Sequence, residues 1–182
     1  MTGRSFRGPA NLPAMDRPQA SPTELCLLRH AHAGDPLKWR GPDDLRPLSS
    51  KGERQVERLA GLLKRTGFAP DAILSSPRLR ALQTAKPVAA ALGLQFRVDE
   101  RLARPLGLEQ LETILVDAGD PERPLLVGHD PDFSDLAALL CGAESVPLRK
   151  GALARIDGVR PFRLGGGTLR WLVPPELLET GS

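Results

Sequence analysis

Aromatic side chains are scarce in this sequence. Tyrosine is absent, and phenylalanine and tryptophan together make up only 4% of the 182 residues. Proteins that bind single-stranded nucleic acid stack the bases on aromatic rings, so this scarcity argues against a base-stacking surface. The net charge of +3 does not change that conclusion, because residues 1–22 hold three arginines and one aspartate and leave a nearly neutral remainder. We therefore expect no nucleic-acid partner.

Long apolar runs and cysteines are scarce as well. No stretch approaches the roughly 20 apolar residues that span a bilayer, and the N-terminal residues lack the apolar segment of a secretory signal. The two cysteines, Cys26 and Cys141, lie in apolar stretches, which favours reduced core thiols over a disulfide. These observations predict a cytoplasmic protein that does not bind a membrane.

The chain divides into two tails and one body. Residues 1–22 contain four prolines and no apolar periodicity, which predicts a flexible N-terminal tail. Residues 23–176 show neither internal repeats nor a linker, so we expect a single domain, and residues 177–182 form a short C-terminal tail. A body of roughly 150 residues is long enough to bury a hydrophobic core.

Strand-like and helix-like segments alternate along the body. The expected strands are 24–29, 71–75, 95–98, 124–128, 152–157 and 168–173. The expected helices run from a Ser49 or Ser50 cap to about 66, from the Ser76-Pro77 start to 92, over 106–118, and from Asp130-Pro131 to about 140. Pro87 should kink or divide the second helix. The alternation predicts an α/β fold, a single-domain three-layer α/β/α sandwich with a mostly parallel central sheet and helices on both faces.

Polar clusters follow three of these strands at their carboxyl ends. Ligands bind beyond the carboxyl ends of the strands in such sheets, so the clusters should converge on one rim. Guanidinium groups bind phosphate oxygens through paired N–H donors, and a neutral imidazole can attack phosphorus. The rim therefore predicts a site for phosphoryl transfer, built from Arg29-His30, Ser75-Ser76, Gly128-His129 and Arg80 one turn into the second helix.

These residues resemble the histidine phosphatase superfamily, which also contains the cofactor-dependent phosphoglycerate mutases. Leu28-Arg29-His30-Ala31 resembles its RHG signature, ILSSPRLRALQTA its second arginine motif with Arg80, and VGHDP its second histidine motif with His129. RPLSSKGERQVERLA and KGALARID resemble segments of the short bacterial phosphohistidine phosphatases of the SixA type. These segments occur in family order over residues 24–173, which makes the resemblance far more specific than an isolated Arg-His pair.

The resemblance implies a metal-independent phosphatase with a phosphoglycerate mutase-like fold and no cofactor. It implies that His30 is phosphorylated, that Arg29, Arg80 and His129 hold the phosphoryl group, and that water then hydrolyses phospho-His30. Arg46 stands where SixA-type proteins also carry an arginine, which suggests a substrate contact. The favoured substrate is a phosphohistidine-bearing protein. The alternatives are a small-molecule phosphoester or pyrophosphate phosphatase and a non-catalytic phosphate-binding regulatory module.

The sequence departs from the family pattern at two places. Ala31 replaces the glycine of the RHG signature, which matters only if that position needs a positive φ. Arg104 stands where the mutases carry their acidic glutamate and cannot donate a proton at neutral pH. Asp130 occupies the position of the aspartate of the acid phosphatase branch, although an N-cap before Pro131 explains it better.

The general acid is therefore open, with Glu100 and Asp35 as more remote candidates than Asp130. An imidazole leaving from phosphohistidine needs less proton donation than an alkoxide leaving from a phosphate ester. A site without the mutase glutamate is thus compatible with a phosphoramidate substrate.

His32 raises a separate hypothesis. Side chains at i and i+2 share one face of an extended strand, so His30 and His32 could chelate zinc. No further metal-ligand motif follows in the sequence, and we therefore expect no metal site and place His32 at the pocket edge or in solvent.

Overall fold

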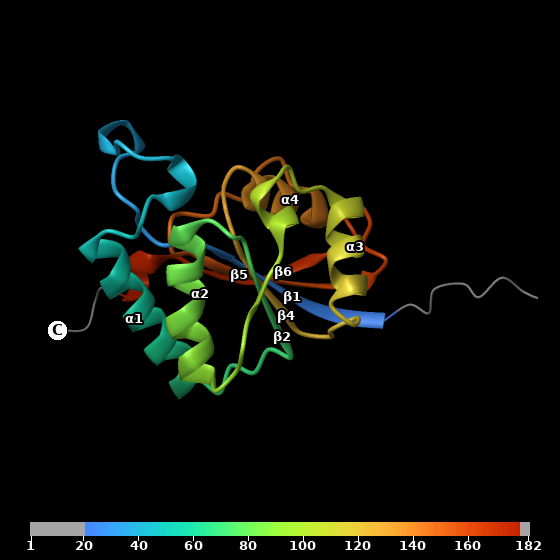
Figure 1. The fold of residues 1–182 in the computed structure, drawn as a ribbon. Coiled ribbons are helices and arrows are strands. Elements are labelled where there is room, and N and C mark those ends of the chain that lie inside the picture. The colour runs from blue at the N-terminus through green and yellow to red at the C-terminus, as the bar shows by residue number, and fades with distance from the viewer. Residues whose placement is uncertain (1–20, 179–182) are drawn as a thin grey trace, which may run out of the picture.

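The computed structural model describes residues 21–178 and is shown in Figure 1. Residues 1–20 and 179–182 lie outside the described residues, and with them most of the two predicted tails. Ser21 and Pro22 already belong to the first strand, and the final described residues form a short 3-10 helix, η4, over Pro175–Leu178.

Strands and helices alternate over the described chain. The strands are β1 (Ser21–Arg29), β2 (Ala72–Ser75), β3 (Arg97–Val98), β4 (Pro124–Gly128), β5 (Leu153–Arg160) and β6 (Thr168–Val173). The α-helices are α1 (Ser50–Arg65), α2 (Leu79–Leu92), α3 (Leu108–Asp117) and α4 (Asp132–Cys141). Three further 3-10 helices are η1 (Pro36–Lys38), η2 (Asp43–Leu45) and η3 (Glu100–Ala103). Within residues 21–178, no helix has the length and apolar character needed to cross a membrane.

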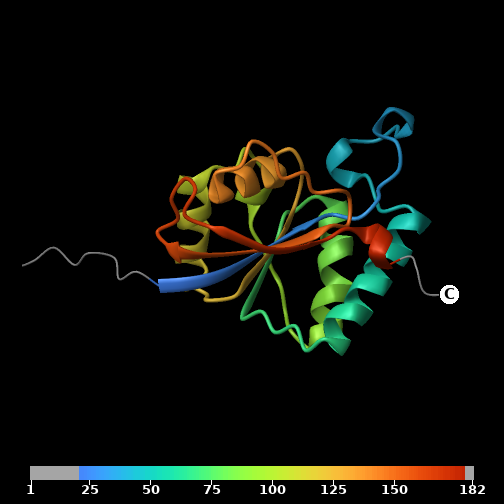
Figure 2. The same cartoon turned by 180° about the vertical axis from the view of Figure 1, so that it is seen from behind.

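The strands form one six-stranded sheet in the order β3-β2-β4-β1-β5-β6. β3, β2, β4 and β1 are mutually parallel, whereas β5 and β6 are added antiparallel at one side. Helices α1 and α2 cover one face of the sheet, and α3 and α4 cover the other, as the two opposite views in Figures 1 and 2 show. The predicted three-layer α/β/α sandwich is confirmed.

β1 is the central strand that carries His30 at its end. Its side chains alternate between the two cores: Leu25 and Leu27 pack on the α3–α4 side, and Cys26 and Leu28 on the α1–α2 side. All four are at most 4% exposed. A strand buried on both faces has little freedom to shift, because a slip of one residue would exchange every side chain between the two cores. The position at which β1 ends is therefore well determined.

Helix α1 begins as the sequence predicts. The Ser49 hydroxyl accepts the Gly52 N–H at 3.3 Å, and the buried face of the helix includes the predicted positions Val56, Leu59, Ala60 and Leu63. Gly52 lies directly against the backbone carbonyl of His32, and a β-carbon at this position would collide with it. Glycine thus allows the first turn of α1 to approach the segment that follows β1.

Helix α2 begins later than predicted. It begins at Leu79 with Arg78 as the N-cap residue, so the expected cap at Ser76 is wrong. Pro87 lies inside the helix without dividing it. The face of α2 that packs on the sheet is fully buried and includes Ala81, Ala85 and Val88. This tertiary packing outweighs the backbone hydrogen bond that a proline removes.

Candidate active site

The three strand ends predicted to converge do lie on one rim. In the register of the sheet, Arg29 of β1 is opposite Gly128 of β4, and Ser75 of β2 is opposite Val127. The pairing continues one residue further, because the His30 N–H donates to the Gly128 carbonyl at 2.9 Å. His30, Ser76 and His129 therefore leave the sheet at the same level, each from a different strand.

Gly128 has a local reason to be glycine. A β-carbon on Gly128 would lie 2.5 Å from the ring of Phe133, which is 1% exposed in the core under α4. The glycine therefore allows α4 to pack its first turn tightly against the end of β4. This contact fixes the direction in which the chain carries His129 out of the sheet.

The His30 imidazole is held in one tautomer. Its Nδ1 lies 2.8 Å from the Ala31 carbonyl, an acceptor, so Nδ1 carries the hydrogen. Its Nε2 accepts a hydrogen bond from Arg80 Nε at 3.2 Å and therefore presents a lone pair. Burial lowers the pKa of His30 to about 3, and the positive charges of Arg80 and Arg29 act in the same direction. At neutral pH the ring is uncharged and its free lone pair is on Nε2.

His129 faces His30 across the rim. The two ring centroids are 5.1 Å apart, and His129 Nε2 lies 2.7 Å from the Ser76 hydroxyl. Burial lowers the pKa of His129 to about 2, and the positive charge of Arg80 lowers it further. Its Nδ1 is buried and makes no hydrogen bond within the described residues. Ser76, predicted as a helix cap, instead contacts this imidazole.

Arg80 is almost fully buried, and all three of its guanidinium nitrogens are engaged. Nε donates to His30, Nη1 donates to the Asp43 carbonyl at 2.7 Å, and Nη2 donates to the Asp43 carboxylate at 2.9 Å. One turn later in α2, the Thr84 hydroxyl accepts the Ala31 N–H at 3.1 Å. Asp120 is the only non-glycine residue of the described chain with a positive φ, so the Ala31 position does not require glycine.

Arg29 is paired with Asp130. Its Nη1 donates to the Asp130 carboxylate at 3.0 Å and to the Leu148 carbonyl at 2.6 Å. Both Asp130 oxygens also accept from the Ser134 hydroxyl at 2.9 Å. The expected N-cap role of Asp130 is wrong: Pro131 is the N-cap residue of α4, and no side chain caps the helix. The Asp130 carboxylate points to Arg29, where both partners of the hydrogen bond carry a charge.

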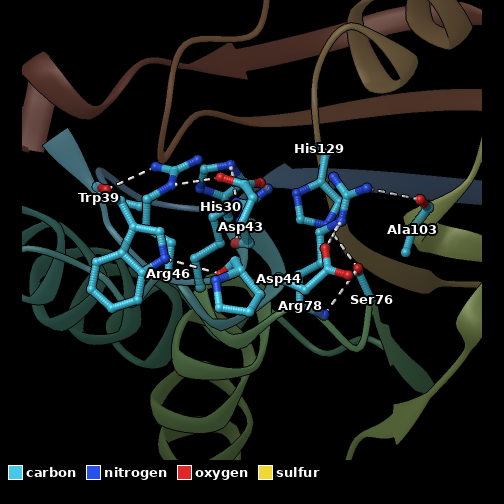
Figure 3. A network of polar contacts seen from close by, with 12 residues as sticks. His30, Trp39, Asp43, Asp44, Arg46, Ser76, Arg78, Ala103 and His129 are labelled. Atoms are coloured by element: carbon cyan, nitrogen blue, oxygen red, sulfur yellow. Dashed lines mark hydrogen bonds and ion pairs between the residues drawn. The ribbon is translucent and has the colours of Figure 1, made fainter. Parts of the chain in front are cut away.

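Arg46 approaches the site from the loop between β1 and α1. It is 8% exposed, its Nη1 donates to the Ala33 carbonyl at 2.8 Å, and its Nε donates to the Asp43 carboxylate at 2.8 Å. Figure 3 shows Asp43 beside Arg46. Sequence reasoning missed Asp43, because it lies in an exposed loop without periodicity. The only signal is its place three residues before Arg46.

The remaining candidates make other contacts. Asp35 caps η1 through the Leu37 N–H, and Glu100 begins η3, which Arg104 follows. His32 Nδ1 lies 2.7 Å from the Ser49 hydroxyl, so this nitrogen is engaged by Ser49 instead of being directed with His30 at a common metal position. No group of three or more histidine, cysteine or acidic side chains within residues 21–178 is arranged to hold a metal ion.

The sequence and the fold are similar to those of known proteins. Residues 25–124 match the family described as the histidine phosphatase superfamily, branch 1. An uncharacterized protein of Picosynechococcus sp. is 39% identical over 83% of this chain and 99% of its own length. The phosphohistidine phosphatase SixA of Escherichia coli is 28% identical over 84% of this chain and 94% of its own. A solved structure of the protein histidine phosphatase SixA complexed with tungstate has a TM-score of 0.73 at 26% identity, covering 86% of this chain and 99% of that one.

Proposed function

Because this chain belongs to the histidine phosphatase superfamily, branch 1, we propose that it is a metal-independent phosphatase acting through phospho-His30 on phosphohistidine in a protein. The observation that carries the proposal is the state of His30: a neutral ring, hydrogen on Nδ1, and an unprotonated Nε2 whose lone pair accepts from Arg80. A group that only bound phosphate would not need a deprotonated nitrogen at the centre of the site.

The first step is transfer of the phosphoryl group to His30. The Nε2 lone pair forms the N–P bond while the bond from phosphorus to the leaving atom breaks, and the leaving group keeps that electron pair. The Arg80 Nε–H, which points at His30 Nε2, then donates to an oxygen of the phosphoryl group bound there. Arg29 and Arg80 offset the negative charge on the phosphoryl oxygens.

The second step is hydrolysis. Water attacks phosphorus in line with the N–P bond. That bond breaks with its electron pair returning to Nε2, and the water proton passes to solvent as inorganic phosphate is released. His129 lies beside the phosphoryl position, at 5.1 Å between ring centroids from His30. An approaching phosphate dianion favours protonation of this imidazole, because an opposite charge within a few ångströms stabilises the charged form. His129 is then a hydrogen-bond donor to the phosphoryl oxygens.

Two features support a phosphohistidine substrate. Asp130 is held by Arg29 and Ser134 as an acceptor, so its contacts do not favour proton donation to a leaving alkoxide, whereas a leaving imidazole needs less help. In addition, the segment between Arg80 and His129 folds into α2, β3, η3, α3 and β4, all within the sandwich, so it contributes no separate cap over the rim. The lack of a cap from this segment is compatible with a phosphorylated side chain of another protein as the substrate.

The test is a comparison of kcat/KM for a phosphohistidine protein, p-nitrophenyl phosphate and common phosphorylated metabolites. We expect the phosphohistidine protein to be preferred, and preference for a metabolite would favour the small-molecule alternative. His30→Ala should lower turnover by several orders of magnitude and abolish phosphoenzyme labelling. His32→Gln is the matched control, because His32 contacts Ser49 instead of the rim.

Metal independence is tested in the same assay. The wild-type rate should be unchanged by EDTA. A loss that zinc reverses, or wild-type-like turnover by His30→Ala, would contradict the proposed mechanism.

A further inference from the structure

Among residues 21–178, Asp43 is the one acidic side chain that contacts two arginines of the candidate site. Its Oδ2 accepts from Arg80 Nη2 at 2.9 Å and its Oδ1 from Arg46 Nε at 2.8 Å. Its backbone carbonyl accepts from Arg80 Nη1 at 2.7 Å. The arginine side chains are 4% and 9% exposed, while that of Asp43 is 53% exposed. An exposed 3-10 turn, η2, thus provides the partner of two buried cations, and Figure 3 shows one of them, Arg46, beside Asp43.

We propose that Asp43 is a positioning residue that orients Arg80 and Arg46 for phosphoryl transfer, an inference that rests on the proposed function. A guanidinium group is planar and has five N–H donors in fixed directions. Two contacts from one residue, through the side chain and the backbone, fix the rotation of the Arg80 plane. The third nitrogen, Nε, then points at His30 Nε2. Each terminal nitrogen keeps one further N–H for a phosphoryl oxygen.

The charge of Asp43 has a second effect. Burial lowers the pKa of Arg80, the charge of Asp43 raises it, and repulsion by the charge of Arg46 lowers it further. Partial burial raises the pKa of Asp43, but the hydrogen bond from Arg46 and the two positive charges outweigh it, and the net pKa lies below its usual value. The carboxylate is therefore ionised at neutral pH and offsets the repulsion between the two cations.

An alternative role for Asp43 is inhibition: its carboxylate would occupy the arginines and compete with phosphate for them. The contacts argue against it. The nitrogen of Arg80 that faces the nucleophile is Nε, and Asp43 contacts only the two terminal nitrogens. Arg80 also donates to the backbone carbonyl of Asp43. This neutral acceptor does not mimic a phosphate group, so it is not a competitor that phosphate has to displace. The two roles predict opposite effects of removing the carboxylate.

The test compares Asp43→Asn with Asp44→Asn. Asp44 is the adjacent acidic residue, is 71% exposed, and pairs with Arg78 instead of Arg80 or Arg46. Asparagine at position 43 loses the charge, and its amide nitrogen cannot accept the Arg46 bond. We expect Asp43→Asn to lower kcat by about 10- to 100-fold, since a misplacement of about 1 Å costs up to that much, with KM changed less than about threefold. Asp44→Asn should stay within about twofold of wild type.

Two further measurements separate positioning from folding and from competition. Asp43→Glu keeps the charge and both acceptors and should recover most of the lost kcat, which a general loss of folding at this turn would not allow. Calorimetry with inorganic phosphate should show weaker binding to Asp43→Asn than to wild type. Tighter phosphate binding, a raised kcat/KM, or wild-type kinetics in Asp43→Asn would overturn the inference. Phosphate binding does not depend on turnover. An inactive wild-type protein would therefore contradict the proposed function, while the comparison of phosphate binding by wild type and Asp43→Asn would still test the role of Asp43.

Discussion

Lowering the pH from 7 to 5 should destabilise the fold through His30 and His129. Both imidazoles are buried, at 5% and 4% exposure, and their pKa values in the folded protein are about 3 and about 2. In the unfolded chain each has the ordinary histidine pKa of about 6.5. Below that value the unfolded state binds more protons than the folded state, so the free energy of unfolding falls as the pH falls from 6.5 toward the folded pKa.

The size of the effect follows from the same pKa values. At pH 5 the unfolded chain gains about 2 kcal/mol from protonating each histidine, because each pH unit below the unfolded pKa contributes about 1.4 kcal/mol. The pair therefore lowers the free energy of unfolding by about 4 kcal/mol between pH 7 and pH 5. The carboxyl groups of Asp43, Asp99 and Asp157 have lowered pKa values and titrate below this window. A loss of this size is a large part of the about 5–15 kcal/mol by which domains are stable.

The assay is urea unfolding followed by circular dichroism at pH 7, 6 and 5. His129→Gln should lose about half of the pH dependence, whatever its stability at pH 7, because only one buried imidazole remains. His32→Gln should keep most of it, since His32 is more exposed. A wild-type free energy of unfolding that changes by less than about 1 kcal/mol over this range would refute the conclusion that both rings are buried and neutral.

Two substitutions probe other contacts of the site. Asp130→Asn should slow phosphohistidine and phosphoester substrates by a similar factor of about 10, because it loosens Arg29 and removes no proton donor; a loss confined to phosphoesters in the kcat/KM panel would instead identify Asp130 as the general acid. Gly52→Ala should lower the free energy of unfolding by about 1–3 kcal/mol in urea, because its β-carbon collides with the His32 carbonyl; unchanged stability would mean that α1 shifts at no cost.

The rim could be predicted from the sequence because a simple rule governs it. Arg29-His30, Ser75-Ser76 and Gly128-His129 each follow a short apolar run, and the carboxyl ends of parallel strands meet at one edge of a sheet. Burial on both faces makes such strands easy to recognise and fixes their register. The fold class and the meeting of His30, Arg80 and His129 therefore followed from local patterns.

The contacts around the rim could not be predicted in the same way. Ser76 and Asp130 both precede prolines and match helix caps, yet their side chains turn to His129 and Arg29 across 53 and 101 residues of sequence. Asp43 reaches Arg80 across 37 residues from an exposed loop. The preference of Ser76 and Asp130 for capping a helix is overridden here. A buried or charged partner from a distant segment offers a stronger hydrogen bond than the nearest helix N–H.

The group that sets the tautomer of His30 is the carbonyl of Ala31, an atom of the main chain. In catalytic triads the equivalent task falls to a carboxylate side chain, which a single substitution can delete. Here every amino acid at position 31 supplies the same acceptor. A mutational scan of side chains would not detect the atom that decides which nitrogen of His30 carries the hydrogen. The tautomer of His30 therefore depends on the path of the backbone, and substitution of a side chain does not remove the acceptor that sets it.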